Sequence, residues 1–120
     1  MGARILIVED SELVTEAFDI LFQSAGYDVS VAATVADAVE KASAAPVDIM
    51  LLDLSLPDGD GLEVLRNLET TGHLPRATLA MTGHDDARIR QRCLDAGCAD
   101  VLLKPLPIAE ILRHIERRLA

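Results

Sequence analysis

The chain is short of cysteines, basic residues and long apolar runs, and each shortage excludes a class of protein. No apolar run approaches the roughly 20 residues that a membrane-spanning helix needs, and the apolar start Met1–Val8 meets acidic residues too soon for a signal peptide. Only Cys93 and Cys98 are present, with no cluster of histidines and cysteines around them. We therefore expect two reduced core thiols in a cytoplasmic protein, rather than a disulfide or a zinc site.

Basic residues are also few, and they are unevenly placed. The chain has 20 acidic and 11 basic side chains, a formal net charge of −9 and a pI near 4.6. Such an acidic chain repels phosphate backbones, which disfavours nucleic-acid binding through bulk charge. Residues 1–60 hold 12 acidic and two basic side chains, whereas residues 61–120 hold eight and nine. This asymmetry between the halves requires an explanation.

The length and the apolar content indicate one folded domain over residues 1–120. Half of the residues are hydrophobic, which is enough for a core. No linker rich in serine and glycine, no repeat and no low-complexity tract divides the chain.

Short apolar runs alternate with helical patterns along the chain. Runs that are apolar on both faces are typical of central parallel strands under helices, and they occupy Arg4–Val8, Ile49–Leu52, Thr78–Met81 and Val101–Leu103. The weaker alternation over Tyr27–Val31 indicates an edge strand. Helical stripes follow each strand, with Thr34 expected to cap the second helix and Asp85 or Asp86 the fourth. Five strand–helix units predict an α/β fold with a parallel sheet and right-handed crossovers.

Polar residues come directly after four of these apolar runs: Glu9, Asp10, Asp53, Thr82 and Lys104. Ligands of open α/β sheets bind at the carboxyl ends of the strands, so these side chains are expected to meet in one cleft. Three carboxylates in one place favour a hard divalent cation such as Mg²⁺, and a lysine can offset the remaining charge.

Such a cleft is suited to phosphoryl transfer. Asp53 is the candidate nucleophile, Lys104 would stabilise charge on the phosphoryl oxygens, and the Thr82 hydroxyl could donate a hydrogen bond to one of them. Each residue alone also has an ordinary structural explanation, such as a helix cap at Glu9 and Asp10 or a turn beginning at Asp53.

The motifs resemble those of the CheY-like receiver domain of bacterial two-component response regulators over essentially the whole chain. The matching segments are Ile5–Asp10, Leu51–Gly61, Met81–Gly83 and Lys104–Pro105. The resemblance implies a flavodoxin-like (βα)₅ three-layer sandwich with a five-stranded parallel sheet in the order 2-1-3-4-5. It also implies that residues 1–120 form a single receiver domain.

The resemblance further implies a role for each matching residue. Asp53 would take a phosphoryl group from a histidine kinase or a histidine phosphotransfer protein. Glu9, Asp10, Asp53 and the backbone carbonyl of Ser55 would hold Mg²⁺ or Mn²⁺. Lys104 would contact the phosphoryl group.

Implied switching features lie around these residues. The Lys104–Pro105 peptide bond would be cis, and Thr82 and Gly83 would move on phosphorylation. The protein would act as a phosphoacceptor that slowly loses its phosphoryl group, and not as an enzyme with turnover.

One position departs from the family pattern, and two others match positions that tune phosphorylation in the family. Val101 replaces the aromatic residue that often reports phosphorylation, and the chain has only three aromatic residues. Ser55 and His84 match positions that influence how long the phosphoryl group persists. In the family the first helix usually meets the phosphodonor, whereas the fourth-to-fifth helix face meets an output domain or a second copy. We therefore interpret the charge asymmetry as a difference in charge between two docking faces. We expect neither face to contact a membrane or to bind nucleic acid directly.

Three other functions fit the sequence less well. A haloacid-dehalogenase-type phosphatase needs a second aspartate where Ser55 stands. An FMN-binding module needs a hydroxyl- and glycine-rich phosphate loop, and Glu9 and Asp10 would repel the phosphate there. An interaction module that works without phosphorylation would be expected to have lost Asp53 or Lys104.

Overall fold

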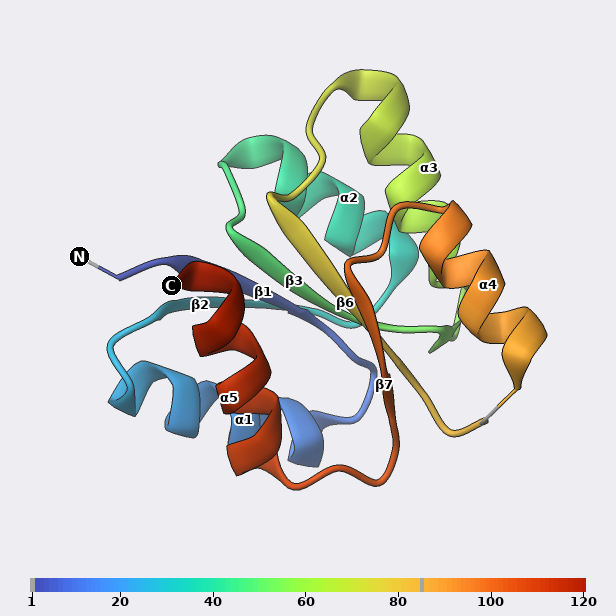
Figure 1. Ribbon diagram of the computed structural model, residues 1–120. Helices are drawn as coiled ribbons and strands as arrows, with labels where there is room; N and C mark the ends of the chain where they lie inside the picture. The colour runs from blue at the N-terminus through green and yellow to red at the C-terminus, as the bar shows by residue number, and fades with distance from the viewer. Residues whose placement is uncertain (1, 85) are drawn as a thin grey trace.

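A parallel sheet covered on both faces forms the centre of the fold (Figure 1). The computed structural model describes residues 2–84 and 86–120. In chain order the elements are β1 (Arg4–Val8), α1 (Glu12–Ser24), β2 (Asp28–Ala32), α2 (Val35–Ala44), β3 (Ile49–Asp53), β4 (Ser55–Leu56), β5 (Gly59–Asp60), α3 (Leu62–Thr71), β6 (Ala77–Thr82), α4 (Ala87–Asp95), β7 (Asp100–Leu103) and α5 (Ile108–Leu119). The five-stranded sheet has the order β2-β1-β3-β6-β7, all parallel. The predicted order 2-1-3-4-5 is therefore confirmed, because β6 and β7 are the fourth and fifth strands of this sheet.

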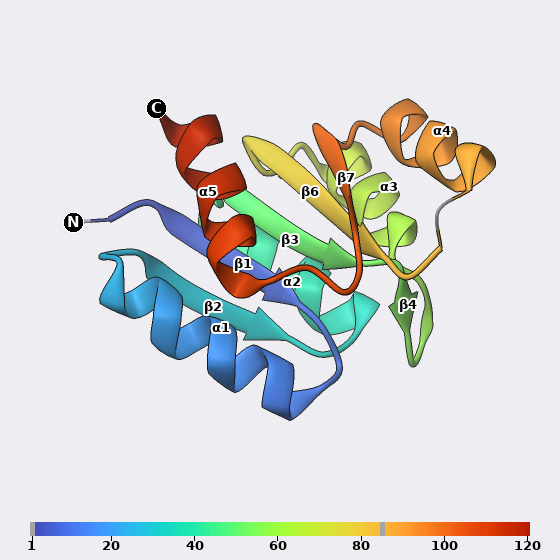
Figure 2. The same cartoon turned by 60° about the horizontal axis from the view of Figure 1, so that its bottom comes forward.

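The side chains of each strand alternate between two separate apolar cores. Leu6 and Val8 pack with α2, α3 and α4, whereas Ile5 and Ile7 face the opposite layer, formed by α1 and α5. Figure 2 shows the same division, with α1 and α5 on one side of the sheet. Burying each of these aliphatic side chains contributes about 1.5–3 kcal/mol, so both layers depend on the apolar runs seen in the sequence.

Side-chain caps begin several helices where the sequence indicates them. Ser11 caps α1, and the Thr34 hydroxyl accepts a hydrogen bond from the backbone N–H of Asp37 at 3.1 Å. Asp86 caps α4 by accepting from the N–H of Arg88 at 2.8 Å. The other predicted cap, Asp85, lies outside the described residues.

The last strand has an apolar run typical of a central strand, yet β7 lies at an edge of the sheet, as the order 2-1-3-4-5 requires. Leu103 is 38% exposed. The run is apolar on both faces because Val101 packs in the core beneath α4, whereas Leu102 packs against α5. Cys93 and Cys98 are both free thiols buried in the first of these cores, as predicted. Among the described residues, no helix has the length and apolarity to span a membrane.

A small antiparallel hairpin, β4–β5, follows β3 and was not predicted. Ser55 pairs with Asp60, and Leu56 pairs with Gly59. Each strand has two residues, which is too short for an alternating pattern to be visible in the sequence. The hairpin connects the carboxyl end of β3 to α3, so it forms one wall of the region where the candidate site lies.

Gly61, just after the hairpin, makes a close approach that only glycine permits. A Cβ there would lie 2.2 Å from the backbone oxygen of Asp53. We predict that Gly61→Ala lowers the free energy of unfolding by about 1–3 kcal/mol, because the backbone must shift to admit the methyl group. Urea denaturation measures this change. Gly83→Ala is the control, because its Cβ would meet nothing within 4 Å; equal losses in both variants would contradict the explanation.

Candidate functional site

The predicted residues gather at the carboxyl edge of the parallel sheet. Glu9 directly follows β1, Asp53 ends β3, Thr82 ends β6, and Lys104 directly follows β7. Since the strands are parallel and in register, their ends bring together residues as far apart in sequence as Glu9 and Lys104. This confirms that these strand ends meet on one side of the sheet.

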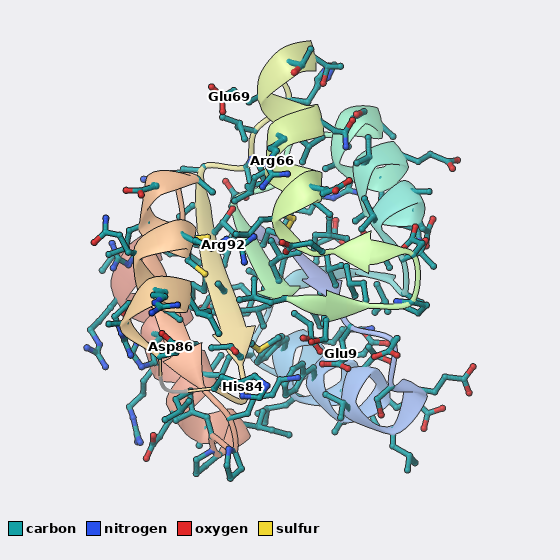
Figure 3. The ribbon with its side chains drawn as sticks, turned by 90° about the vertical axis from the view of Figure 1, so that its right-hand side faces the viewer. Glu9, Arg66, Glu69, His84, Asp86 and Arg92 are labelled. Carbon is teal, nitrogen blue, oxygen red and sulfur yellow. The ribbon has the colours of Figure 1, made fainter. Side chains whose placement is uncertain are left out.

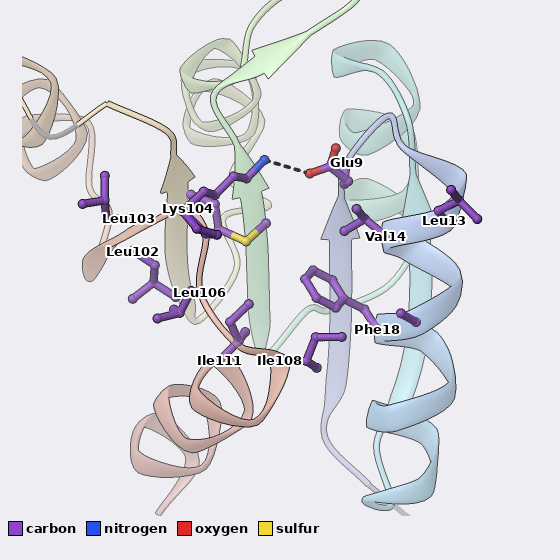
Figure 4. Close-up of a pocket in the computed structure, with 13 residues that line it drawn as sticks. Glu9, Leu13, Val14, Phe18, Leu102, Leu103, Lys104, Leu106, Ile108 and Ile111 are labelled. Carbon is purple, nitrogen blue, oxygen red and sulfur yellow. Dashed lines mark hydrogen bonds and ion pairs between the residues drawn. The ribbon is translucent and has the colours of Figure 1, made fainter.

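One lysine bridges two buried carboxylates at this edge. Lys104 Nζ lies 2.8 Å from Asp53 Oδ2 and 3.1 Å from Glu9 Oε2. The side chains of Glu9 and Asp53 are 5% and 8% exposed, whereas that of Lys104 is 38% exposed. Figure 4 shows Lys104 reaching from the end of β7 toward Glu9. The ammonium group therefore offsets part of a charge that burial would otherwise make costly.

Burial and the shared lysine shift all three pKa values. Burial raises the pKa of Glu9, and the adjacent Asp53 raises it further against the opposing effect of Lys104. Burial also pushes the pKa of Asp53 upward, but hydrogen bonds with Glu9, Lys104 and the Ser55 backbone outweigh it and leave that pKa below its usual value. Burial lowers the pKa of Lys104, yet its hydrogen bonds to Asp53 and Glu9 raise it overall. As pH falls, Glu9 takes up a proton before Asp53, because the pKa of Glu9 is raised and that of Asp53 is lowered.

Asp10 completes a group of three carboxylates that suits a hard cation. Glu9, Asp10 and Asp53 each offer an oxygen, and these oxygens all lie within 4.8 Å of one another. Asp10 is exposed, which leaves a side of the cluster open to water. Against Lys104, the three carboxylates leave two negative charges, which one divalent cation would balance. Oxygen ligands and retained water are what Mg²⁺ prefers, so the donor set fits this ion.

The backbone after Asp53 and the Lys104 side chain together fix the orientation of the Asp53 carboxylate. The N–H of Ser55 donates to Asp53 Oδ1 at 2.9 Å, while Lys104 holds the other oxygen. The N–H of Gly61 donates to the carbonyl of Leu54 at 2.9 Å, which closes the loop that carries the hairpin. Asp53 is thus a positioned carboxylate with both oxygens engaged, and not a solvated turn residue.

The remaining predicted residues border this cluster at varying distance. The Thr82 hydroxyl is buried and accepts a hydrogen bond from the N–H of His84 at 3.2 Å, whereas Gly83 and His84 are exposed. Figure 3 shows His84 beyond the end of β6. The backbone N–H of Lys104 donates to the Thr82 carbonyl at 2.7 Å. The Lys104–Pro105 peptide bond is cis, as the resemblance implied.

Val101 is the predicted residue that lies apart from the cleft. It pairs with Ala80 inside the sheet and is buried in the core beneath α4. Its side chain therefore belongs to the packing of α4 rather than to the carboxylate cluster.

The acidic residues of the hairpin bind the starts of two helices. The Asp58 carboxylate accepts hydrogen bonds from the N–H groups of Val35 at 2.8 Å and Ala36 at 3.2 Å, at the start of α2. Asp60 accepts from the N–H of Leu62 at 3.0 Å, at the start of α3. Carboxylates favour the positive end of a helix, so both residues fasten the hairpin to its neighbours.

An apolar groove of about 440 Å³ adjoins the carboxylates. It lies between α1 and the segment leading into α5, with Phe18, Met81 and Ile111 among its lining residues (Figure 4). Leu13, at its rim, is 82% exposed. The walls of this groove come from segments that are distant in sequence, so no local sequence pattern indicates it.

Comparison with known proteins gives consistent matches over nearly the whole chain. Residues 5–116 match the sequence family described as "Response regulator receiver domain". The chain is 37% identical over 116 residues to the response regulator MprA of Mycobacterium ulcerans, covering 96% of this chain and 49% of that protein. It is 35% identical over 121 residues to the swarming motility regulation protein RssB of Serratia marcescens, covering 98% and 54%. The chain thus spans about half the length of these relatives.

Solved structures show the same similarity. The receiver domain of a sensor histidine kinase from Pseudomonas aeruginosa, solved with a magnesium ion in its active-site cleft, is 31% identical with a TM-score of 0.86, covering 99% of this chain and 98% of that one. The chemotaxis response regulator CheY4 of Vibrio cholerae is 25% identical with a TM-score of 0.91, covering 98% and 99%.

The bridging lysine leads to a stability prediction. Lys104→Met would leave two buried carboxylates without their shared cation. We expect this to lower the free energy of unfolding by about 1–3 kcal/mol at neutral pH without metal. This range lies between the cost of breaking a buried pair and that of an exposed one. The loss should shrink as pH falls through the raised pKa of Glu9, because a protonated Glu9 needs no counter-charge.

Urea denaturation, repeated from neutral pH down through the pKa of Glu9, measures this loss of stability. Arg113→Met is the control, because Arg113 forms an exposed pair with Glu110 at 3.9 Å. A loss at Lys104 that is as small as the loss at Arg113, or that does not depend on pH, would contradict the prediction.

Proposed function

The chain belongs to the response regulator receiver domain family, and from this we propose that Asp53 accepts a phosphoryl group from a phosphohistidine partner. The chain is a receiver domain of a two-component response regulator. The residue roles, the cation and the phosphodonor are our proposals, as is the extension of the single receiver domain over residues 1–120. A cytoplasmic location stays a prediction.

One observation carries the proposal: the buried Asp53 carboxylate is held on both oxygens beside a lysine and two more carboxylates. In the reaction, one Asp53 oxygen would attack the phosphorus of the phosphohistidine. A P–O bond would form, the P–N bond would break, and the electron pair would leave with the imidazole nitrogen. The product is an acyl phosphate on Asp53.

The residues around Asp53 would supply positioning and charge. Lys104 already points its ammonium at the reacting carboxylate, and Thr82 has a hydroxyl at the adjacent strand end. Glu9, Asp10, Asp53 and the Ser55 carbonyl would hold Mg²⁺ or Mn²⁺, which when bound neutralises charge on the phosphoryl oxygens. Phosphoryl transfer depends mainly on such positioning and neutralisation.

The same geometry disfavours the other functions. Ser55 contributes its backbone N–H to Asp53 and has no carboxyl group to activate water, which supports a phosphoacceptor over a phosphatase with turnover. An interaction module that works without phosphorylation would not need the buried Asp53 carboxylate that Lys104 offsets at 2.8 Å.

The proposed partners occupy different parts of the surface. A histidine kinase or histidine phosphotransfer protein would approach beside α1, where exposed Leu13 and the apolar groove border the carboxylates. The face between α4 and α5 would contact an output domain or a second copy. Because the chain spans about half of its curated relatives, a further output segment in the whole protein is itself a proposal.

Phosphorylation can be tested directly. We expect the chain, incubated with acetyl phosphate and Mg²⁺, to gain the mass of one phosphoryl group, and Asp53→Asn to gain none because an amide is not a nucleophile for this step. Intact-mass spectrometry measures the adduct. Asp58→Asn, on the adjacent hairpin, is the matched control and should still be phosphorylated. Equal modification of wild type and Asp53→Asn would reject Asp53 as the acceptor.

The side chain at Ser55 should affect the lifetime of the acyl phosphate. Ser55 is short and exposed, so it covers the Asp53 carboxylate poorly against attacking water. We expect Ser55→Asn to lengthen the acyl-phosphate half-life severalfold, measured by the decay of the mass adduct after the donor is removed. Ser24→Asn, at the far end of α1, should leave it unchanged. An unchanged half-life in Ser55→Asn would contradict this role.

A further inference from the structure

Helix α4 is weakly anchored to the rest of the domain. Among the described residues of this helix, only Cys93 is buried, and Ile89 is partly buried against the core. Three arginines, Arg88, Arg90 and Arg92, make this helix strongly basic. A helix with so little buried apolar surface opens more easily than its neighbours, so individual polar contacts have a large effect on its position.

One ion pair ties this helix to the hairpin that follows the phosphoacceptor. Arg92 Nη2 lies 2.5 Å from Asp60 Oδ2, across 32 residues of sequence. Figure 3 shows Arg92 on the side of α4 that faces α3 and the hairpin. The other oxygen of Asp60 accepts the N–H of Leu62, so the carboxylate is fixed by two donors. Burial raises the pKa of Asp60, but the Leu62 N–H and Arg92 outweigh it and lower that pKa, which keeps the pair charged.

The hairpin also touches the phosphoacceptor directly. Ser55 donates its N–H to Asp53 Oδ1, and Ser55 is the residue that pairs with Asp60 across the hairpin. Four residues therefore form a continuous path from the site to α4: Asp53, Ser55, Asp60 and Arg92.

We propose that the Asp60–Arg92 ion pair is the link through which the state of Asp53 controls the position of α4. This rests on the proposed function. Phosphorylation of Asp53 Oδ2 turns the carboxylate into an acyl phosphate, whose remaining oxygen Oδ1 is an uncharged carbonyl and a weaker acceptor for the Ser55 N–H. The hydrogen bond that orients the hairpin is then weakened, and the geometry of Asp60 against Arg92 changes with it. Arg92 and Asp60 act here as positioning residues and take no part in the chemistry.

The size of the effect follows from the exposure of the pair. The side chains of Arg92 and Asp60 are 54% and 35% exposed. An exposed pair of this kind changes the opening equilibrium of α4 by up to about fivefold. Salt should weaken it, because exposed charges are screened. Amide hydrogen exchange of α4 reports an opening equilibrium of this size.

The experiment compares hydrogen exchange in α4 before and after phosphorylation with acetyl phosphate and Mg²⁺, with the adduct quantified by mass in the same samples. In wild type, phosphorylation should speed α4 exchange by up to about fivefold. In Arg92→Gln, α4 should exchange fast already, and phosphorylation should not change it. Arg92→Lys should restore part of the response, and added salt should reduce the wild-type response.

Arg88→Gln is the matched control, because it removes the same charge from the same helix and no described carboxylate pairs with that side chain. It should keep the wild-type response. If Arg92→Gln only lowers the starting protection and still responds to phosphorylation, the pair is merely structural and the inference is wrong. A phosphorylated wild type whose α4 exchange does not speed up also overturns it. Absence of any adduct in wild type would instead overturn the proposed function, and the inference with it.

Discussion

The Lys104 ammonium, set between two buried carboxylates, is the contact on which the arrangement at the carboxyl edge of the sheet depends. It joins residues that follow or end β7, β1 and β3, which are separated by up to 95 positions. Two buried carboxylates would repel each other without it, and their strand ends would be destabilised. The same contact leaves two net negative charges with Asp10, so the interaction that stabilises the fold also leaves the site suited to a divalent cation.

The hairpin β4–β5 connects this site to the helices α2, α3 and α4 on one face of the sheet. Its acidic residues bind the start of α2 through Asp58, and the start of α3 and the side of α4 through Asp60. Each contact is modest, because helix-end and exposed ionic interactions contribute about 0.3–1 kcal/mol apiece. Together they attach a segment of few residues to three helices, which is why acidic residues accumulate after β3.

Much of the fold and most of the carboxylate cluster could be predicted from the sequence. Apolar runs such as Arg4–Val8 marked the strands, and the polar residue after each run marked the site, because parallel strands end on one side. Contacts made through tertiary structure could not be predicted. Asp60 could have been suggested as a helix cap from its place before Leu62, but its pairing with Arg92 depends on how α4 packs. The apolar pattern of β7 did not by itself mark an edge strand, because helices pack on both its faces.

The division of the core into two layers has a consequence for how the protein can change over time. Because strand side chains alternate, Ile5 and Ile7 belong to the core under α1 and α5, whereas Leu6 and Val8 belong to the other. Substitutions in separate cores combine nearly additively when they share no contacts. The surface over α1, where we propose that the phosphodonor binds, can therefore diversify without forcing compensating changes in the core under α4. Duplicated copies of such a chain could thus acquire new inputs while retaining their outputs.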